Sequence, residues 1–116
     1  MPPKGDAAYL WDMLDAARTV TTLTTGSDFA AYSSNRMMQL AVERTIEIIG
    51  EAARKVSKEF QQAHSEIPWH PIIVQRHVLA HDYGSILQDR IWRVVTVHIP
   101  ELIRLLEPLV QAFPPP

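Results

Sequence analysis

The longest regular pattern in this chain is an apolar stripe between Asn35 and Val56, and its spacing is helical. Its members recur at three- and four-residue steps with a seven-residue repeat: Met38, Ala41, Val42, Thr45, Ile49, Ala52, Ala53 and Val56. A stripe of about five turns predicts one long helix that buries one face. Leu40 and Ile46 fall off the stripe, which indicates a second buried side, either within a bundle or against another subunit.

The segment before this stripe shows the same spacing and predicts a first helix. Its apolar positions are Leu10, Met13, Leu14, Ala17 and Val20. Asp6 is the residue type that caps helices, and we expect it to cap this one. Gly26 and Ser27 interrupt the pattern, so the helix should end there, and residues 28–33 should form a short turn of another helix.

The second half of the chain predicts a connector and two further helical segments. Residues 61–71 form the connector, and Pro71 can open the next helix because a missing N–H costs nothing in the first turn. That helix should cover 71–81. The last segment, 87–112, repeats apolar residues at helical steps, and Pro100 interrupts it, which predicts a kink or two consecutive helices.

Together these segments predict a single all-α domain over residues 1–116, folded as an up-and-down bundle of four to five helices. At this length a chain can bury a real hydrophobic core without disulfides or metals. There is no alternating strand pattern of useful length. The final residues, 113–116, read FPPP and are expected to form a flexible proline tail.

Composition excludes several classes of protein. The chain has no cysteine, so disulfides and thiolate metal sites are excluded, and a reducing compartment fits. No segment approaches the ~20 continuous apolar residues of a membrane span, and the N-terminus is no signal peptide. We therefore expect a cytoplasmic protein with no membrane partner. The formal charge of −2 argues against a broadly basic surface, so any contact with a polyanion would be local.

The stretch QRHVLAHDYG concentrates groups that handle protons and phosphates: Arg76, His77, His81 and Tyr83. On an ideal helix of about 100° per residue, Arg76 and Tyr83 lie nearly on one face, whereas Arg76 and His81 diverge by about 140°. To act on one substrate, the latter two need the helix to end or loosen before His81, or they need a second copy from a partner chain. Gly84 favours a helix end here.

Three chemical interpretations of this stretch stay open on spacing alone. Arg76 offers a planar fork of donors for phosphate oxygens, and His81 can serve as a general acid or base; together they suffice for metal-free RNA cleavage by the ribose 2′-OH. His77 and His81 have the i, i+4 spacing of a metal pair. No HExxH motif or clear third ligand accompanies them, so we expect no metal. In the third interpretation, these groups merely satisfy helix-end carbonyls and pair with Asp82.

Beyond its spacing, the stretch resembles the R-x4-H-x-Y motif of the HepT-like toxins of the HEPN superfamily. ERTIEIIGEAARKVS (43–57) resembles that family's long central helix with its IGEA stretch. EIPWHPII followed by RHVLAHDYG is similar to its connector and motif helix, and IWRVVTVHIPEL (91–102) to its last helix, including the proline. The likeness runs from roughly residue 8 to 110.

The resemblance implies an α-helical ribonuclease toxin that acts as a homodimer, with both motif regions lining a cleft at the subunit interface. It also implies a partner, a minimal nucleotidyltransferase antitoxin of the MNT type, which transfers AMP from ATP to the motif tyrosine. Carried over to this chain, Arg76 would bind and stabilise the scissile phosphate, His81 would be the general acid/base and Tyr83 the AMP acceptor. RNA would be the substrate, with no cofactor, no metal and no DNA partner.

One position departs from the family's pattern. The residue after the arginine is often a small polar amide, and here it is His77, which could be an extra phosphate donor or a neutral surface residue. Two functions remain: an endoribonuclease toxin silenced by AMPylation of Tyr83, or a non-catalytic nucleotide-binding or docking module for a nucleotidyltransferase. Arg76 with His81 favours the first, since a docking module needs no proton-transfer group. The acidic charge favours the second.

Overall fold

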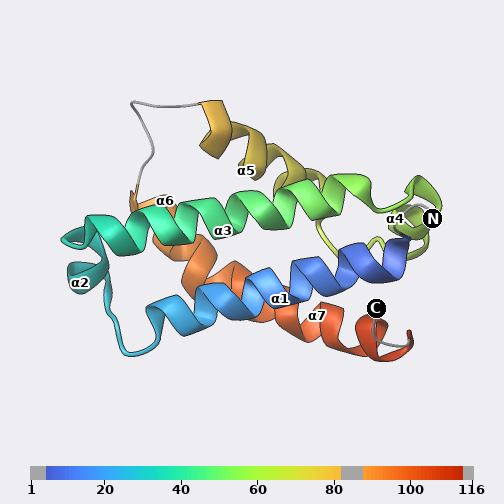
Figure 1. The fold of residues 1–116 in the computed structure, drawn as a ribbon, viewed down its shortest axis with the longest axis horizontal. Helices are drawn as coiled ribbons and strands as arrows, with labels where there is room; N and C mark the ends of the chain where they lie inside the picture. Colours follow the sequence, from blue (N-terminus) through green and yellow to red (C-terminus); the bar gives the residue numbers. More distant parts are fainter. Residues whose placement is uncertain (1–4, 82–87, 114–116) are drawn as a thin grey trace.

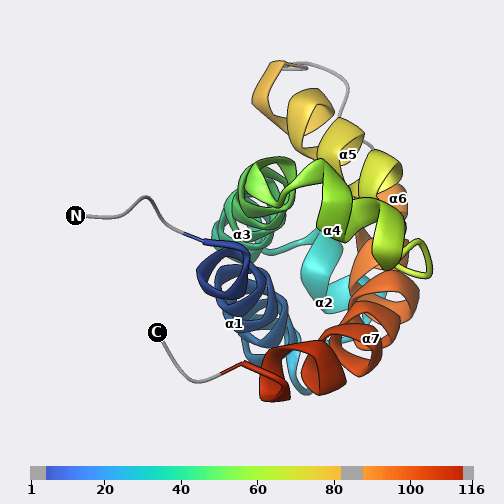
Figure 2. The same ribbon diagram turned by 90° about the vertical axis from the view of Figure 1, so that its right-hand side faces the viewer.

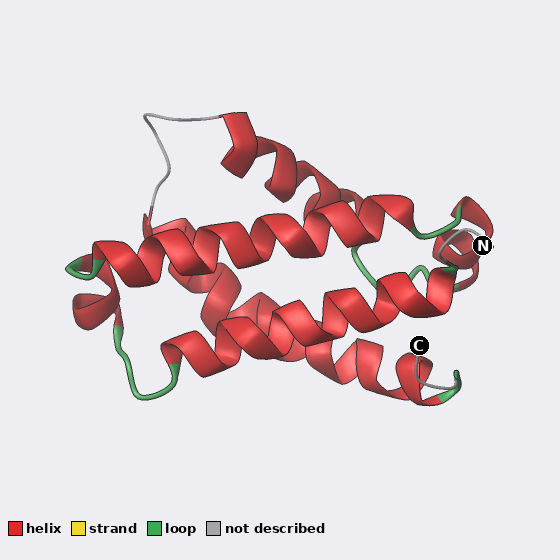
Figure 3. Ribbon diagram, viewed as in Figure 1, coloured by secondary structure: helices red, strands yellow, loops and turns green. Residues whose placement is uncertain are grey.

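The computed structural model describes residues 5–81 and 88–113, and for residues 76–81 it describes the backbone alone. Within these ranges every regular element is helical and no strand occurs (Figure 3), so the predicted all-α class is confirmed. The long helices are α1 (Asp6–Thr24), α3 (Arg36–Lys55), α5 (Trp69–His81) and α7 (Ile99–Gln111). Shorter elements are α2 (Phe29–Ser33), α4 (Lys58–Ala63), α6 (Gln88–Arg93) and the π-helical turn η1 (Val94–His98).

The long helices form the up-and-down bundle that the sequence predicts. Helices α1 and α3 run in opposite directions side by side, and α7 runs back along α1 (Figure 1). Viewed along the bundle, α1, α3 and the α6–α7 stretch surround the core, while α5 packs on the outer side of α3 (Figure 2). In Figure 1, α5 diverges from α3 toward its C-terminal end. No helix within the described ranges is long and apolar enough to cross a membrane.

Side-chain caps explain where several helices begin. The Asn35 carboxamide accepts a hydrogen bond from the Met38 amide (3.0 Å), and the Asp28 carboxylate accepts one from the Ala31 amide (2.8 Å). Each cap satisfies an amide that has no partner inside its own helix. The chain turns between α1 and α2 at Gly26, whose φ of 79° is the left-handed conformation that glycine adopts readily. The predicted break and the short second helix are therefore confirmed.

The prediction that Asp6 caps the first helix is wrong. The helix begins at Asp6, and the capping position is Gly5, which has no side chain to accept a bond. The Asp6 carboxylate instead accepts hydrogen bonds from the amide (2.8 Å) and hydroxyl (2.7 Å) of Ser57. Asp6 therefore bonds to a residue 51 positions away, and not to the amides at the start of its own helix.

The predicted connector, 61–71, is also partly wrong. Helix α4 covers Lys58–Ala63, so the connector's first three residues are helical. Ser57 starts this helix by accepting a hydrogen bond from the Phe60 amide (3.2 Å). Helix α5 begins at Trp69, two residues before Pro71, which lies in the first turn, where its missing N–H is tolerated. The helix extends through His81; Gly84, where we expect it to end, lies outside the described residues.

The last segment is divided into consecutive helices, as predicted, but the division lies before Pro100. Residues 94–98 form the π-helical turn, in which the Ile99 amide donates to the Val94 carbonyl, five residues back. Pro100 then occupies the first turn of α7, where no intrahelical donor is needed.

The core is one cluster to which α1, α2, α3 and the α6–α7 stretch all contribute. Its largest fully buried side chains are Tyr32, Leu10, Met13, Leu14, Ile67, Ile91, Leu106, Val20, Val42 and Val110. Of the two residues off the α3 stripe, Ile46 is buried within the bundle, whereas Leu40 is 50% exposed. At the C-terminus, the Phe113 ring lies 6.3 Å from that of Phe60. Residues 114–116 lie outside the described ranges, and the flexible tail stays a prediction.

Candidate functional site

The motif stretch begins on the C-terminal half of α5. The helix includes the backbone of Arg76, His77 and His81, whereas Tyr83 and Gly84 lie outside the described residues. Because α5 continues through His81, the helix does not end before that residue. The positions of Arg76 and His81 therefore stay about 140° apart around the axis, by the geometry of an α-helix. The roles of all four motif residues remain predictions.

The N-terminal end of α5 is fixed by packing and by a hydrogen bond at Trp69, seven residues before Arg76. Trp69 is 7% exposed, and its indole Nε1 donates a hydrogen bond to the His64 carbonyl (3.0 Å). Its ring meets that of Phe60 edge-on at 6.3 Å. One turn further, Ile72 and Ile73 pack against the core. The start of the motif helix is thus fixed by aromatic and aliphatic contacts.

After residues 82–87, which lie outside the described ranges, the next described residue is Gln88 in α6, and its side chain bridges two other helices. The Tyr32 hydroxyl donates a hydrogen bond to Gln88 Oε1 (2.6 Å). In turn, Gln88 Nε2 donates one to Glu43 Oε2 (2.8 Å). Tyr32 comes from α2 and Glu43 from α3, so one carboxamide ties three elements together.

Two further residues of α3 close this network into a ring. Arg36 Nη1 lies 3.8 Å from Glu43 Oε2 and donates to Gln39 Oε1 (3.3 Å). Gln39 Nε2 donates to the Tyr32 carbonyl (2.9 Å). We call these five residues, Tyr32, Arg36, Gln39, Glu43 and Gln88, the α2–α3–α6 junction.

Three members of the junction are shielded from water, whereas the Arg36 side chain is 66% exposed. Tyr32 is 0%, Gln39 7% and Glu43 9% exposed. Burial, reinforced by the Glu43 carboxylate, raises the pKa of the Tyr32 phenol far above its usual value, so the hydroxyl stays a donor. Sequence reasoning missed the junction because its central bonds join residues 45 and 56 positions apart, for which no local pattern gives a signal.

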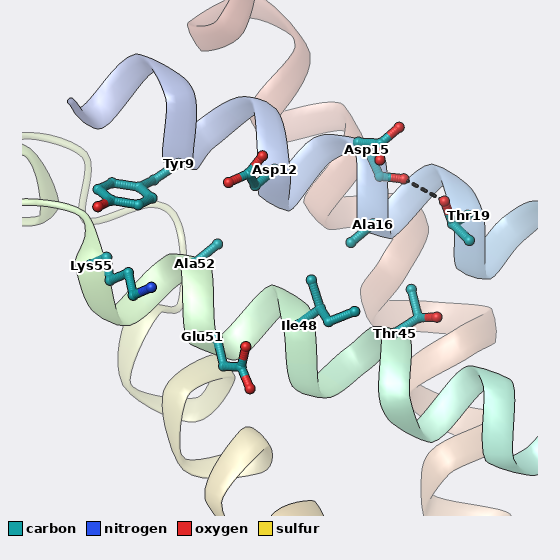
Figure 4. A pocket seen from close by; sticks show the side chains of 10 residues that line it. All are labelled: Tyr9, Asp12, Asp15, Ala16, Thr19, Thr45, Ile48, Glu51, Ala52 and Lys55. Atoms are coloured by element: carbon teal, nitrogen blue, oxygen red, sulfur yellow. Dashed lines mark hydrogen bonds between the residues drawn. The ribbon is translucent and has the colours of Figure 1, made fainter. Parts of the chain in front are cut away.

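A groove of about 320 Å³ runs between α1 and α3 (Figure 4). Asp12 and Asp15 line it from α1, and Glu51 and Lys55 line it from α3. The Lys55 ammonium lies 5.9 Å from the centre of the Tyr9 ring. With three carboxylates against one ammonium among these charged groups, the groove would repel a phosphate backbone, so it is a poor candidate for an RNA site.

A second groove, of about 310 Å³, lies between α3, α5 and the start of α7. Its walls are mainly aliphatic, with Ile46, Ile49, Ile72, Leu102 and Leu105 among them. Such a surface offers little to a phosphate, which needs charged or amide donors. For metals, the described ranges hold no group of three or more His, Asp or Glu side chains placed to bind an ion.

An all-helical bundle with R-x4-H-x-Y beginning on one of its helices defines a small HEPN-type protein, and comparison with known proteins agrees. The chain matches the family described as Ribonuclease HepT-like over residues 13–109. It therefore belongs to the HepT-like ribonuclease family, and the resemblance seen in the sequence is confirmed at this level.

Three relatives illustrate the match. "Probable ribonuclease HepT" of Thermococcus cleftensis is 33% identical over 94 residues, which cover 81% of this chain and 86% of that protein. "Putative RNase MJ1380" of Methanocaldococcus jannaschii is 32% identical over 100 residues, covering 86% and 92%. "Putative RNase TTE0752" of Caldanaerobacter subterraneus subsp. tengcongensis is 31% identical over 103 residues, covering 89% and 92%. No solved structure matches the chain.

Proposed function

We propose that this protein is a metal-independent endoribonuclease, the toxin of a toxin–antitoxin pair, with Arg76 and His81 as its catalytic residues. One observation carries the proposal: a chain of the HepT-like ribonuclease family bears R-x4-H-x-Y, with its Arg and His on α5. The substrate is RNA, and the protein works in the cytoplasm, where RNA is found.

In this mechanism the ribose 2′-OH attacks the adjacent phosphorus. His81 accepts the hydroxyl proton as a general base, and the P–O5′ bond breaks as a proton returns to the leaving oxygen. The products are a 2′,3′-cyclic phosphate and a 5′-hydroxyl. Negative charge builds up on the phosphoryl oxygens in the transition state, where the fixed charge of Arg76 stabilises it more than in the ground state. His77 is a candidate for a further donor to the phosphate.

The proposed active form is a homodimer. The supporting argument is the helical register, since α5 extends through His81 and keeps the positions of Arg76 and His81 about 140° apart. Two copies facing each other across a twofold axis would let Arg76 of one chain approach His81 of the other. A twofold dimer is the commonest oligomer.

The proposed off switch is AMP on Tyr83, added by an MNT-type nucleotidyltransferase antitoxin. The phenolic oxygen would attack the α-phosphorus of ATP and release pyrophosphate. The resulting phosphodiester carries a negative charge seven residues from Arg76, where it would compete with RNA for the guanidinium. Tyr32 is unsuited as an acceptor, because it is 0% exposed and its hydroxyl is bonded to Gln88.

The decisive experiment is RNA cleavage in excess EDTA by unmodified wild type, Arg76→Ala and His81→Ala. We expect wild-type cleavage to persist and each variant to lose about 100-fold or more. Arg18→Ala is the matched control, because Arg18 pairs with Glu107 on the exposed surface (3.5 Å) and should cleave normally.

Two further results would decide between the alternatives. Absence of cleavage by wild type, with intact mass confirming a bare Tyr83, would contradict the nuclease and leave a nucleotide-binding or docking module, which the charge of −2 mildly favours. With ATP and the nucleotidyltransferase, wild type and Tyr9→Phe should each gain AMP, whereas Tyr83→Phe should not. AMP on the last variant would contradict the assigned acceptor.

A further inference from the structure

We propose that Arg90 and Arg93, on the exposed side of α6, bind the phosphate backbone of the RNA substrate. Neither residue belongs to the R-x4-H-x-Y motif. The inference rests on the proposed function, because it names residues that bind the substrate of that reaction. The two arginines contribute to binding of the strand and not to the chemical step.

Helix α6 packs its apolar residues against the bundle and leaves its arginines in solvent. Ile91 is 2% exposed, and the Trp92 ring lies 5.0 Å from the Tyr32 ring. Arg90 and Arg93 are both exposed. They are three residues apart, so they occupy neighbouring turns on one side of the helix. Two guanidinium groups therefore lie close together on the surface.

Within the described ranges, neither Arg90 nor Arg93 forms an ion pair. Asp89 precedes Arg93 by four residues, a spacing that permits a salt bridge on a helix, but the two side chains do not pair. Other exposed arginines do lie beside a glutamate, in the pairs Arg18–Glu107, Arg36–Glu43, Arg44–Glu47 and Arg104–Glu101. The positive charge of α6 is therefore not neutralised by a neighbouring carboxylate.

A stabilising role at a helix end does not explain this pair. Basic side chains often lie at the C-terminus of a helix, where they interact with carbonyl groups that have no intrahelical partner. Helix α6 has no free end at Arg93, because that residue keeps helical angles (φ −63°, ψ −41°) and the chain continues into η1. Both guanidinium groups are thus available to an anion.

The directions of the helices place the pair toward the motif. Gln75 of α5 and Val94 of η1 both line the second groove. Helix α5 and the α6–α7 stretch run in opposite directions along it (Figure 1). Arg76 follows Gln75, and Arg93 precedes Val94. The motif and the arginine pair of α6 therefore extend from the groove toward the same end of the bundle.

The distribution of charge favours RNA at this surface. The groove between α1 and α3 has three carboxylates against one ammonium, and α6 lies across the bundle from it (Figure 2). A chain with a formal charge of −2 can bind a polyanion only where its positive groups are locally in excess. The planar guanidinium fork also fits phosphate oxygens. The α6 surface meets both conditions.

The test measures binding of a single-stranded 2′-O-methyl oligonucleotide, which cannot be cleaved because its methylated 2′ oxygen cannot attack phosphorus. The double variant Arg90→Gln with Arg93→Gln is compared with Arg54→Gln, an exposed arginine near the end of α3. The logarithm of the binding constant falls with the logarithm of salt concentration by about 0.7 per phosphate contact, so the slope should drop by about 1.4 in the double variant. The control should keep the wild-type slope.

Two further measurements separate binding from catalysis and from folding. With cleavable RNA, the double variant should raise KM by about fivefold or more and leave kcat within about twofold, because the contacts are equal in the ground and transition states. Asp89→Asn removes the carboxylate of α6 and should tighten oligonucleotide binding by about twofold. All three side chains are exposed, so Tm should stay near that of wild type.

Three results would overturn the proposal: an unchanged slope in the double variant, an equal drop in Arg54→Gln, or weaker binding by Asp89→Asn. A double variant that binds the oligonucleotide normally but no longer binds the nucleotidyltransferase would assign the surface to a protein partner instead of RNA. Failure of the proposed function looks different. Wild type would then cleave no RNA while its binding still depends on the two arginines. Absence of binding by wild type would overturn both.

Discussion

The two ends of the bundle are held together by different kinds of hydrogen bond. At the end where α1, α4 and α5 begin, side chains bond mainly to backbone groups: Gln61 to the Val56 carbonyl, Trp69 to the His64 carbonyl, and Asp6 to the Ser57 amide. The bond from the Ser57 hydroxyl to Asp6 joins two side chains. At the other end, the α2–α3–α6 junction is built mainly from bonds between side chains, closed into a ring.

This difference shows which end of the bundle depends more strongly on the identity of its side chains. A backbone group is present whatever the sequence, so a bond to it requires one suitable side chain. A bond between side chains requires two, and the ring requires several at once, which makes its members energetically coupled. Substitutions at the coupled end should therefore have larger and less additive effects on stability than those at the other end.

The largest effect should come from Tyr32→Ala. This change removes a fully buried aromatic ring and leaves Gln88 without its donor, and it should lower the free energy of unfolding by about 3–5 kcal/mol. Urea denaturation measures the loss. Tyr32→Phe is the control: it keeps the ring and should lose about 1–3 kcal/mol. Equal losses in the two variants would mean that the ring contributes little.

Alkaline pH should weaken the junction selectively. The raised pKa keeps Tyr32 protonated when folded, whereas the unfolded phenol ionises near pH 10. The protonated Tyr32 hydroxyl therefore contributes fully to the free energy of unfolding below about pH 10. This contribution is lost above that pH, by up to about 1.4 kcal/mol per pH unit. The stability advantage of wild type over Tyr32→Phe should shrink between about pH 9 and 11. A constant difference in urea denaturation would contradict this prediction.

Local patterns in the sequence predicted the helices, since each is specified by neighbours. The Asn35 and Asp28 caps act within three residues, and the Pro100 break follows from one missing N–H. The errors share one cause. Asp6 bonds to a residue 51 positions away, and the ring joins α2, α3 and α6 across gaps of 45 and 56 positions. Such contacts arise only once the helices have packed.

The candidate site also has one part that the local sequence predicts and one part that it does not. Its residues were recognised from a sequence motif, and the helical backbone of α5 then fixed the angular spacing of Arg76 and His81. In our proposal, Arg76 of one subunit meets His81 of the other. The spacing of residues along one sequence does not show which residues meet across a subunit interface.

A smaller effect is expected at the opposite end, from Asp6→Ala. The carboxylate holds both the amide and the hydroxyl of Ser57, which begins α4. Its loss should lower the free energy of unfolding by about 1 kcal/mol, measured in urea, and leave RNA cleavage unchanged. Asp28→Ala removes a comparable cap beside the junction and should lower the free energy of unfolding by a similar amount. A loss of cleavage in Asp6→Ala at a temperature where it is fully folded would contradict the prediction.

The smallest effect should come from Glu101→Gln, on the exposed face of α7. Hydrogen bonds from Arg104 lower the pKa of the Glu101 carboxyl below its usual 4.5. A lowered pKa contributes stability above the ordinary value, and that contribution is lost as the pH falls through the folded value. Because both groups are exposed, water screens the pair. Tm should differ little at neutral pH and converge in acid; a growing gap in acid would contradict the prediction.

The π-helical turn of Val94–His98 predicts how the fold responds when one residue is deleted from the chain. A π-turn accommodates one more residue than an α-turn closed at the same place. Deleting one residue there would convert the π-turn into an α-turn closed at the same place, and α6 and α7 would keep nearly the same register. Leu102 and Leu106 would then stay in the core. A frame-preserving deletion of a single residue should therefore be tolerated far better inside this turn than in the middle of α7, where it would rotate the residues that follow by about 100°.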